Sequence, residues 1–429
     1  MCRHYRLMAA IVYLVPTFAN AQTPPHTMPD PRTEAAIELM TRFAERTGLT
    51  SGQPRQRYLW TDAFAVCNFL GLARTTGKAQ YRQLALQLID QVHHTLGRYL
   101  PDDPRSGWIS GLDEQEGMAH PTLGGLRIGK ELPERAPHEP FDEQLEWERD
   151  GQYFHYLTQW MHALDQATRA TGQPRFNIWG RELAETAYDA FTYVPSGEVR
   201  NRMYWKMSID LSRPLVPSMG QHDPLDGYIT GIQLQTTASL LPGPVPGPYV
   251  GDLAEQFAAM IARDSLVTAD PLGLGGLLVN AARVEQLMRN GAFPDGNLLE
   301  SLLTAALAGL DHYARRQDPG LPAQFRLAFR ELGLAIGLQA LVSLRESIAA
   351  HPEPLPNDAA LRRLLEALMQ YAPLGSDIES FWRDPEQQQT ATWSEHRNIN
   401  EVMLATCLAP DGFLALPAPH LNDALPVLE

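Results

Sequence analysis

Three aspartates lie at the start of apolar stretches, where a carboxyl can be held away from water and still face a cavity. They are Asp62 in LWTDAFAV, Asp150 in DGQYFHYL and Asp226 in HDPLDG. Two carboxyls whose environments push their pKa values apart can serve as a general acid and a general base. We predict catalytic roles for all three aspartates, with Asp150 and Asp226 as the leading pair.

Aromatic, imidazole and charged side chains occur in or beside the same stretches. Tryptophan rings suit ligands with apolar faces, while histidine and charged side chains supply hydrogen bonds. His155 lies on a polar helical stripe with Gln152, Gln159 and His162, which indicates a cavity or a buried polar network. The residues predicted to bind a ligand are Trp60, Trp147, His155, Trp205, Lys206, His222, Arg330, Glu331, His396 and Arg397.

Several of the aspartates also have a purely structural interpretation. Asp223 and Asp270 each precede a proline, as helix N-caps often do, so we predict that both cap helices. Asp62 and Asp150 also suit the first turn of a helix, where the helix dipole favours a carboxylate. Catalysis and helix stabilisation are therefore both open for Asp62 and Asp150.

Charged pairs on two helical stretches leave a structural alternative open as well. Arg330 and Glu331 are costly in an apolar helix unless they are paired or face a wet cavity, and an ion pair with a neighbouring helix meets that condition. Arg397 and Glu401 are four residues apart and are suited to pair with each other.

Helical periodicity dominates the chain and supplies the elements that must hold these residues. Short turns with glycine or proline separate the helices in pairs, and longer linkers rich in aromatic, His and carboxylate residues follow the pairs. The predicted helices are 33–48, 60–76, 79–98, 150–171, 178–193, 225–240, 250–263, 272–290, 296–316, 325–348, 357–371 and 396–409.

The hydrophobic pattern divides these helices into two classes. Those that begin at 60, 150, 272 and 325 are apolar nearly all round, which is typical of buried helices, whereas those at 79 and 357 have one polar face. This alternation predicts an all-α fold, an (α/α)6 toroid of six hairpins in which helix 33–48 lies beside the last helix. An open helical array is the main alternative. In the toroid the N-termini of the inner helices and the long linkers share one mouth, where binding residues concentrate.

Residues 203–227, MYWKMSIDLSRPLVPSMGQHDPLDG, alternate apolar and polar side chains as a strand does. We predict a short extended segment that lies across the mouth, apolar side down, ends near Pro214 and brings Asp226 to the cavity. Lys206 is expected either at the rim of the cavity or in an exposed pair with Asp210.

The bulk composition is typical of a globular protein and argues against some partners. Of 429 residues, 44% are hydrophobic and 20% are charged, and the net charge of -15 disfavours nucleic acid or an anionic membrane surface as a partner. Cys67 and Cys407 lie in apolar helical runs, which favours buried free thiols. No residues have zinc-ligand spacing, and we predict no metal or cofactor.

The N-terminus has the three parts of a secretory signal. Arg3 and Arg6 precede an apolar stretch, and Ala19-Asn20-Ala21 fits a cleavage site, so we predict export to the periplasm or the exterior. A wrongly assigned start upstream of a cytosolic protein is the alternative. The predicted divisions are a signal peptide at 1–21, a flexible segment at 22–32, one toroid domain at 33–415 and a C-terminal tail at 416–429.

Motifs that span nearly the whole mature chain resemble the six-hairpin glycosidase superfamily. They are LWTDAFAV, DGQYFHYLTQWMHAL, MYWKMSIDLSRPLVPSMGQHDPLDG, DPLGLGGLL, RLAFRELGLAIGL and HRNINEVML. The resemblance implies the toroid and a carbohydrate-type pocket at its mouth. In the unsaturated glucuronyl hydrolases of this fold, aspartates at inner-helix ends act as acid and base, and the positions comparable to them here are Asp62, Asp150 and Asp226.

A second group with the same toroid, the N-acylglucosamine epimerases, works with paired histidines beside an arginine and a glutamate. The residues that resemble this set by position are His155, His396, Arg330 and Glu331. The resemblance therefore implies either of two chemistries at one mouth.

We predict a carbohydrate-active protein, foremost a glycoside hydrolase in which paired aspartates act on a saccharide stacked against tryptophan. The alternatives are a sugar epimerase or isomerase that uses histidine with arginine and glutamate, and a non-catalytic saccharide-binding protein. The expected partner is a small-molecule or oligosaccharide substrate, with no membrane insertion after signal cleavage. The sequence does not determine the sugar, the linkage or the oligomeric state.

Overall fold

The structure is a computed structural model that describes residues 30–316, 320–351 and 353–420. The predicted signal peptide at 1–21, most of the segment 22–32 and the end of the chain at 421–429 lie outside the described residues.

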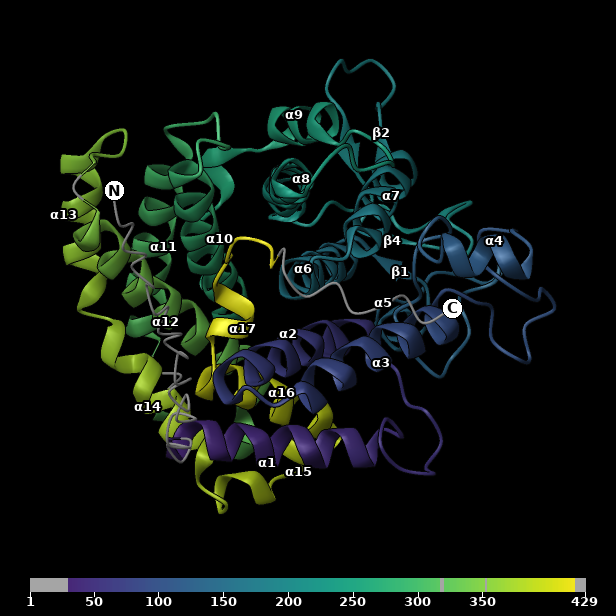
Figure 1. Cartoon of the computed structure of the whole chain (residues 1–429), viewed down its shortest axis with the longest axis horizontal. Helices are drawn as coiled ribbons and strands as arrows, with labels where there is room; N and C mark the ends of the chain where they lie inside the picture. Colours follow the sequence, from purple (N-terminus) through teal and green to yellow (C-terminus); the bar gives the residue numbers. More distant parts are fainter. Residues whose placement is uncertain (1–29, 317–319, 352, 421–429) are drawn as a thin grey trace, which may run out of the picture.

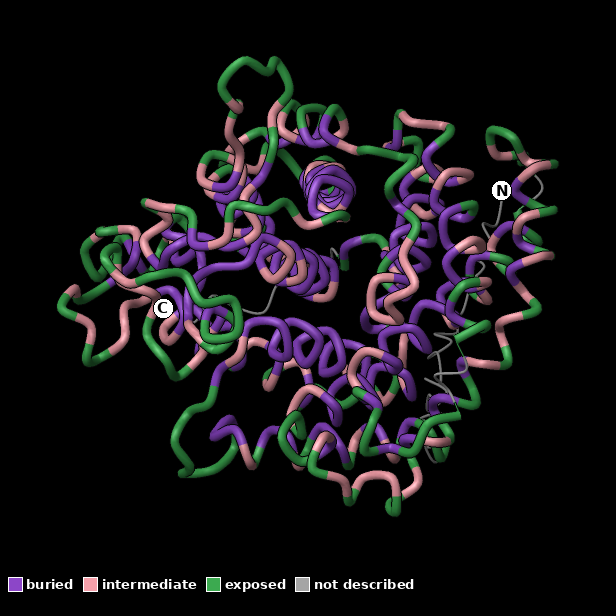
Figure 2. Tube along the Cα trace, turned by 180° about the vertical axis from the view of Figure 1, so that it is seen from behind, coloured by how far each residue is buried: buried purple, intermediate pink, exposed green. Residues whose placement is uncertain are grey.

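An inner ring of helices surrounds the middle of the molecule (Figures 1 and 2). Each inner helix packs against the next along the chain, and the last packs against the first, so the ring is closed. These helices are buried along most of their length, as their nearly uniform apolar composition requires. The inner helices are α2 (Leu59–Thr76), α6 (Phe154–Thr171), α8 (Asp223–Leu240), α10 (Pro271–Arg289), α12 (Ala328–Ala350) and α16 (Arg397–Leu408).

An outer layer of helices covers this ring, and each member packs on its inner neighbour. The first helix of the chain packs on α16 and completes the last hairpin. The predicted (α/α)6 toroid is therefore confirmed. The outer helices are α1 (Pro31–Arg46), α3 (Ala79–Leu96), α7 (Pro174–Phe191), α9 (Gly251–Met260), α11 (Leu298–Arg315), α13 (Asp358–Met369) and α14 (Ala372–Arg383).

The remaining helical elements are short and lie in the linkers or at the end of the described chain. In the sequence, 372–395 is expected to be a linker, but α14 occupies much of it and packs on α12. The short elements are α4 (Glu114–Ala119), α5 (Glu143–Glu148), η1 (Arg263–Ser265), η3 (Ala323–Phe325), η4 (Gln387–Gln389), α15 (Ala391–Glu395) and α17 (Asp411–Leu414).

Helices α10 and α12 make the closest backbone approach in the inner ring. A Cβ added to Gly275 would lie 2.1 Å from the carbonyl oxygen of Gly333, and one added to Gly337 would lie 2.6 Å from the Cα atom of Gly275. Glycine lowers helix propensity, so its use here reflects the need for contact between the two backbones.

Helix α12 also has the length and hydropathy of a membrane span. In the most apolar window of this helix, 61% of the residues are buried inside the molecule. Packing of α12 against α10, α14 and α16 accounts for that apolar composition.

Short strands lie at the mouth end, in the linkers that precede α6 and α8. The strands β1 (Gln152–Tyr153), β4 (Lys206–Met207) and β5 (Pro214–Val216) form an antiparallel sheet in the order β1-β4-β5, and β2 (Thr192–Tyr193) pairs with β3 (Arg202–Met203). The predicted β segments in the mouth loops are therefore present.

The single extended segment predicted within 203–227 is wrong in detail. The chain turns between β4 and β5, where the carboxylate of Asp210 accepts hydrogen bonds from Ser208 and Ser212, and Pro214 begins a strand rather than ending one. The predicted pair of Lys206 with Asp210 does not form, because Lys206 is fully buried against Glu146.

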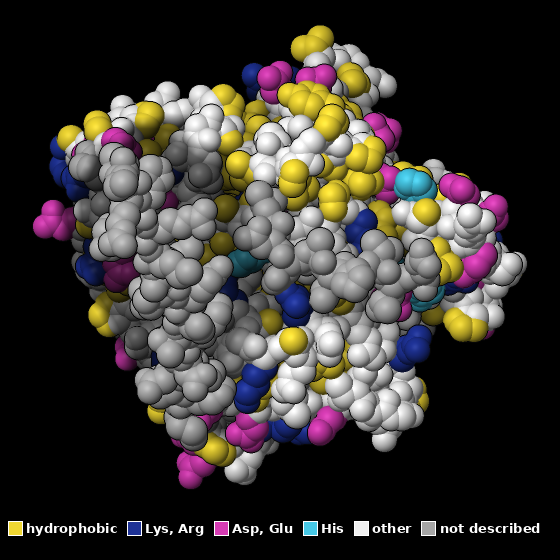
Figure 3. Space-filling model, in the orientation of Figure 1, with side chains coloured by type: hydrophobic (Ala, Val, Ile, Leu, Met, Phe, Trp, Pro, Cys, Tyr) yellow, Lys and Arg dark blue, Asp and Glu magenta, His cyan; other side chains and the backbone are white. Residues whose placement is uncertain are grey.

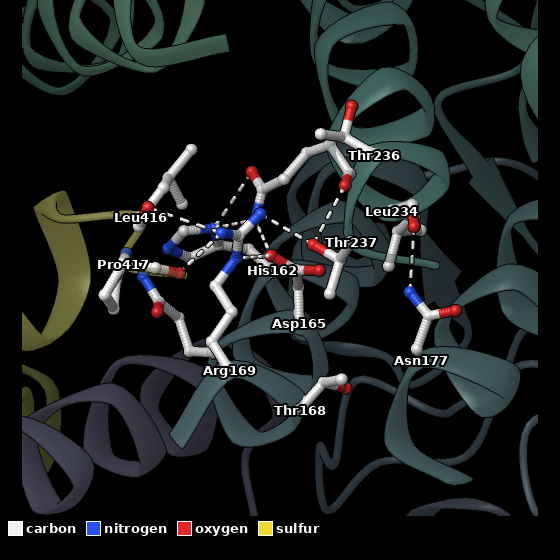
Figure 4. A network of polar contacts seen from close by, with 12 residues as sticks. His162, Asp165, Thr168, Arg169, Asn177, Leu234, Thr236, Thr237, Leu416 and Pro417 are labelled. Carbon is white, nitrogen blue, oxygen red and sulfur yellow. Dashed lines mark hydrogen bonds and ion pairs between the residues drawn. The ribbon is translucent and has the colours of Figure 1, made fainter. Parts of the chain in front are cut away.

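The described residues after α16, 409–420, lie by the C-terminal ends of α2 and α6, which is the end of the toroid opposite the mouth (Figure 1). The guanidinium of Arg169 donates to the carbonyl oxygens of Leu416 and Pro417, at 3.3 and 2.8 Å, and to the hydroxyl of Thr237 at 2.6 Å (Figure 4). The backbone N–H of His420 donates to the carbonyl of Arg169. The described part of the predicted tail, residues 416–420, is thus held against α6.

Figure 3 shows the face that carries this segment. Hydrophobic side chains gather over α7 and α9, while charged side chains of both signs are scattered over the rest of the visible surface. The thiols of Cys67 and Cys407 are buried and free, as predicted. Burial raises the pKa of both thiols well above the usual range, so neither is an accessible thiolate.

Candidate functional site

A central cavity of about 350 Å³ lies within the inner ring and takes residues from all six inner helices. It lies towards the N-terminal ends of most of these helices, which is the mouth predicted from the linkers. The polar and aromatic side chains that line it are Trp60, Phe64, His155, Gln159, Trp205, His222, Asp223, Asp226, Asp270, Asn280, Arg283, Arg330 and Phe413, among others.

Two aspartates in the first turn of α8 are the acidic pair of this cavity. Asp223 and Asp226 are three residues apart, a spacing that places two side chains on the same helix face. Asp223 is 4% exposed, and its burial together with the charge of Asp226 raises its pKa to about 8. Burial also raises the pKa of Asp226, against the opposing effects of Asn280, His222 and Arg283.

The two carboxyls differ in their hydrogen bonds. Asp226 Oδ1 accepts a hydrogen bond of 2.8 Å from Asn280 Nδ2 of α10. Asp223 Oδ2 is buried and has no hydrogen-bond partner among the described residues. Asp226 is therefore the better stabilised carboxylate, whereas Asp223 is the better candidate to hold a proton near neutral pH.

The predicted capping role of Asp223 is wrong. Asp223 is the first residue of α8, His222 occupies the N-cap position, and neither side chain accepts a capping hydrogen bond. The corresponding prediction for Asp270 is confirmed, because Asp270 Oδ1 accepts from the N–H of Gly273 at 3.0 Å at the start of α10. The same Asp-Pro motif therefore has two roles in this chain: Asp270 caps a helix, whereas Asp223 does not.

Three buried polar atoms of cavity residues lack partners within the described chain. They are Trp60 Nε1, His155 Nδ1 and Asp223 Oδ2, from α2, α6 and α8 respectively. Buried polar groups are nearly always hydrogen-bonded in native proteins, so such a concentration is typical of a site that a polar ligand or water completes.

His155 and His222 approach the acidic pair from two sides. His155 Nδ1 lies 4.0 Å from Asp223 Oδ1, and burial lowers the pKa of His155 to about 4, so its imidazole is neutral at pH 7. His222 Nε2 lies 2.9 Å from the carbonyl oxygen of Leu266, which fixes this ring nitrogen as the donor. Of the predicted polar stripe on α6, His155 and Gln159 line the cavity.

Aromatic rings form much of the cavity wall. The rings of Trp60 and Trp205 lie 5.9 and 6.2 Å from the ring of His155, and both tryptophans line the cavity as predicted. Trp147 does not line it; it is 43% exposed and packs edge-on against Trp205 at 4.8 Å. Trp147 therefore supports the cavity residue Trp205 and does not itself face the cavity.

The floor of the cavity comes from the C-terminal segment. Phe413 of α17 stacks on Phe64 with ring centroids 4.3 Å apart and meets the ring of His162 edge-on at 5.0 Å. The carbonyl oxygen of Phe413 lies 2.9 Å from His162 Nε2, so α17 is hydrogen-bonded to α6. We call α17 with its Phe413 ring the plug of the cavity. The sequence offered no signal for this role, because α17 has only four residues.

A buried arginine lies at the inner side of the acidic pair. Arg283 of α10 donates to the side-chain oxygens of Gln233, Asn280 and Thr230 and forms no direct ion pair within the described residues. Sequence reasoning missed Asn280 and Arg283, although polar residues in the apolar helix 272–290 were a usable signal.

Arg330 and Glu331, at the start of α12, have different surroundings. Arg330 lines the central cavity and forms an ion pair with Asp270, whereas Glu331 is buried away from it and accepts from Arg326 Nη2 at 2.6 Å and Trp382 Nε1 at 2.8 Å. The predicted ion pair with a neighbouring helix therefore forms for Arg330, whose partner caps α10, whereas Glu331 pairs with Arg326 in the segment just before α12. Only Arg330 also contacts the cavity.

Asp150 and Lys206 are buried and hold together the linkers before α6 and α8, which lie at the mouth. Asp150 accepts from Arg127 Nη1 at 2.5 Å and from the N–H groups of Gly129 and Gly151. Lys206 Nζ donates to Glu146 Oε1 at 2.9 Å and to two carbonyl oxygens. Neither residue lines the central cavity, so the structure does not bring Asp150 and Asp226 together as an acid–base pair.

A second cavity of about 830 Å³ at the same mouth holds three further residues predicted to be functional, Asp62, His396 and Arg397. The carboxylate of Asp62 accepts from the N–H of Tyr58 at 2.9 Å and lies 3.4 Å from Arg57 Nη1. Burial raises the pKa of Asp62 to about 6. The predicted pair of Arg397 with Glu401 does not form, because Glu401 pairs with Arg46.

Within the described residues, no group of three or more His, Cys, Asp and Glu side chains is arranged to hold a metal ion. The carboxyls, imidazoles and aromatic rings of the central cavity offer proton transfer, hydrogen bonding and aromatic stacking.

Comparisons with known proteins give one type of match. No protein-family model matches the chain, and no curated protein matches it. Among solved structures, the chain is similar to a crystal structure of D-mannose isomerase, with a TM-score of 0.47 and 12% sequence identity over 89% of this chain and 97% of that chain.

Proposed function

We propose that the protein is a saccharide-processing enzyme that hydrolyses a glycosidic bond in the central cavity, with Asp223 as the general acid and Asp226 as its ionised partner. The observation that carries this proposal is the pair of buried carboxyls in the first turn of α8, one of them with an unpartnered oxygen. Enclosed carboxyl pairs of this kind divide into an acid and a base.

Glycoside hydrolysis requires a carboxyl that protonates the leaving oxygen and a carboxylate that activates water or attacks the sugar. The raised pKa of Asp223, about 8, keeps its proton in place at neutral pH. Burial raises the pKa of Asp226 as well, but the hydrogen bond from Asn280 and the nearby charge of Arg283 oppose that rise. We therefore assign the proton of the pair to Asp223 and the negative charge to Asp226.

Substrate binding follows from the cavity wall. The apolar C–H face of a sugar ring suits the rings of Trp60 and Trp205, and its hydroxyl groups can satisfy Trp60 Nε1 and His155 Nδ1. This fit supports a saccharide as the substrate class over an apolar molecule.

A sugar isomerase or epimerase is the second candidate, because one observation favours it. His155 is a neutral imidazole whose Nδ1 is free within the described chain and lies 4.0 Å from Asp223 Oδ1, an arrangement that can move a proton between neighbouring sugar carbons. This chemistry converts a free sugar and releases no second product.

The test uses Asp223→Asn and Asp226→Asn with a panel of oligosaccharides and free monosaccharides. We expect release of a reducing sugar by the wild type and a loss of at least about a hundredfold in kcat for both variants. Asp252→Asn, an exposed first-turn aspartate of outer helix α9, is the matched control and should keep full activity.

Interconversion of monosaccharides without hydrolysis, abolished in His155→Ala, would replace hydrolysis by the isomerase. Full activity in both aspartate variants would exclude the acid–base pair. Saccharide binding without any turnover in the wild type would favour the non-catalytic alternative.

A further inference from the structure

The second cavity adjoins the central cavity across an aromatic partition. The ring of Tyr156, which lines the second cavity, lies 5.3 Å from the ring of Trp60, which lines the central one. Phe329 and Arg330 are consecutive and line the second and the central cavity respectively. The two cavities are therefore neighbours at one mouth, separated by these packed rings.

The second cavity is cationic, although the whole chain has a net charge of -15. Six arginine and lysine side chains line it against three carboxylates. Its walls come from the linkers before α2 and α6, the N-terminus of α16 and the C-terminal ends of α1 and α3. The dipole of α16 adds positive potential and those of α1 and α3 oppose it, so the cationic character comes from the side chains.

Half of these cations already have partners in the protein. Arg46 pairs with Glu401, Arg57 lies beside Asp62, and Arg127 pairs with Asp150. These contacts explain three of the six side chains as structural and reduce the charge that is available to a ligand.

The other three cations have no ion-pair or hydrogen-bond partner in the part of the chain that the structure describes. They are Arg55 and Arg397, which are exposed, and Lys130, which is half-buried. Burial lowers the pKa of Lys130, and the negative charges of Glu148 and Asp150 offset this only in part, without a direct ion pair to Lys130 in the described chain. Three free cations from three separate segments converge on one cavity.

We propose that the second cavity binds an oxyanionic substituent of the saccharide, with Lys130, Arg55 and Arg397 as its counter-ions. This inference rests on the proposed function to the extent that the neighbouring ring in the central cavity is a sugar. The shared chemistry is a carboxylate, sulfate or phosphate carried on the saccharide, and arginine and lysine bind all three through charge-assisted hydrogen bonds.

The experiment measures binding by titration calorimetry, so it does not depend on turnover. The probes are a galacturonate trisaccharide, a sulfated galactose trisaccharide, a neutral galactose trisaccharide, mannose 6-phosphate with mannose as its neutral counterpart, and inorganic phosphate alone. We expect at least one acidic saccharide to bind at least about tenfold more tightly than its neutral counterpart at low ionic strength. The difference should shrink at high ionic strength, because salt screens partly exposed charges.

Variants of the second cavity test whether its cations cause the preference for acidic saccharides. Lys130→Met combined with Arg397→Gln should reduce the preference to less than about threefold, whereas Lys130→Arg should retain it because it keeps the charge. Arg363→Gln, which removes an exposed arginine of outer helix α13, is the matched control and should bind as the wild type does.

Equal binding of acidic and neutral saccharides by the wild type would overturn the proposal, as would a preference that survives in the Lys130 and Arg397 double variant. Binding of inorganic phosphate without binding of any saccharide would also overturn it. An acidic preference that follows the variants while no saccharide is turned over supports the second cavity and contradicts the hydrolase, so the two failures are distinguishable.

Discussion

At the scale of single residues, the environment of Asp223 decides the chemistry of the cavity. Its carboxyl is nearly fully buried, is close to a second carboxyl and has one oxygen without a partner in the described chain. These conditions favour the protonated form and make Asp223 a donor at neutral pH.

The raised pKa of Asp223 predicts a specific pH dependence of stability. Between about pH 4, the ordinary pKa of an unfolded aspartate, and pH 8, the folded protein holds a proton that the unfolded chain has lost. The folded state binds more protons there, so this residue makes the free energy of unfolding fall as pH rises through that window.

Asp223→Asn removes this contribution. The variant should match the wild type near pH 4 and become more stable than it, by on the order of a few kcal/mol, at pH 8. Urea unfolding across this range measures the difference, with Asp252→Asn as the control. A difference between Asp223→Asn and the wild type that stays constant with pH would contradict the assignment.

The candidate site could be predicted only in part from residue types. Trp60, His155, Trp205, His222, Asp226 and Arg330 reach the central cavity, and periodicity or position at the mouth was a sufficient signal for them. Asp150 and Lys206 were indistinguishable from site residues in the sequence, because their buried partners, Arg127 and Glu146, are 23 and 60 residues away. Glu331 pairs with the nearby Arg326, but its burial also depends on Trp382, 51 residues away.

At the scale of elements, the helices were predictable because each carries its own apolar pattern. All twelve predicted helices are present, with ends displaced by a few residues, and α14 was missed. The broken strand between β4 and β5 was not predictable, because the burial of Lys206 depends on Glu146, sixty residues away.

The contact of α10 with α12 permits a matched test within one helix. A methyl group at Gly275 would meet the backbone of Gly333, whereas a methyl at Gly276 has no atom within 4 Å. We expect Gly275→Ala to lower the free energy of unfolding by at least about 2 kcal/mol, because neither backbone can move alone. Gly276→Ala should raise it by up to about 1 kcal/mol through helix propensity.

Urea unfolding of both variants measures this contrast. Equal stability of the two would show that α10 and α12 are not in backbone contact. The test concerns the scaffold and does not depend on any substrate.

At the scale of the whole molecule, the toroid is closed twice. The contact of α16 with α2 closes the ring, and the C-terminal segment closes the end opposite the mouth. The sequence indicated the first closure through the helix count. For the second closure, the sequence predicted only a C-terminal tail. The hydrogen bonds that hold this segment run from Arg169 to backbone carbonyl oxygens, and any residue can supply a carbonyl oxygen, so its residue types gave no signal.

The plug is expected to contribute to the stability of the whole fold. Phe413 is 5% exposed, stacks on Phe64 and meets the ring of His162 edge-on, so Phe413→Ala should lower the free energy of unfolding by about 3–5 kcal/mol. Phe325→Ala is the control, because Phe325 is 67% exposed and its loss should change stability by less than about 0.5 kcal/mol. A Phe413→Ala cost as small as that of the control would show that the C-terminal segment is not docked.

The central claim is that the mouth of the toroid holds a protonated carboxyl acid at neutral pH. The direct measurement is a pH titration by ¹³C NMR of protein labelled at the aspartate carboxyl carbon, with the Asp223 signal assigned by its absence in Asp223→Asn. We predict a midpoint near pH 8 for Asp223. A midpoint near the ordinary aspartate value of about 4 would contradict the account, because no proton would then be available for the leaving group.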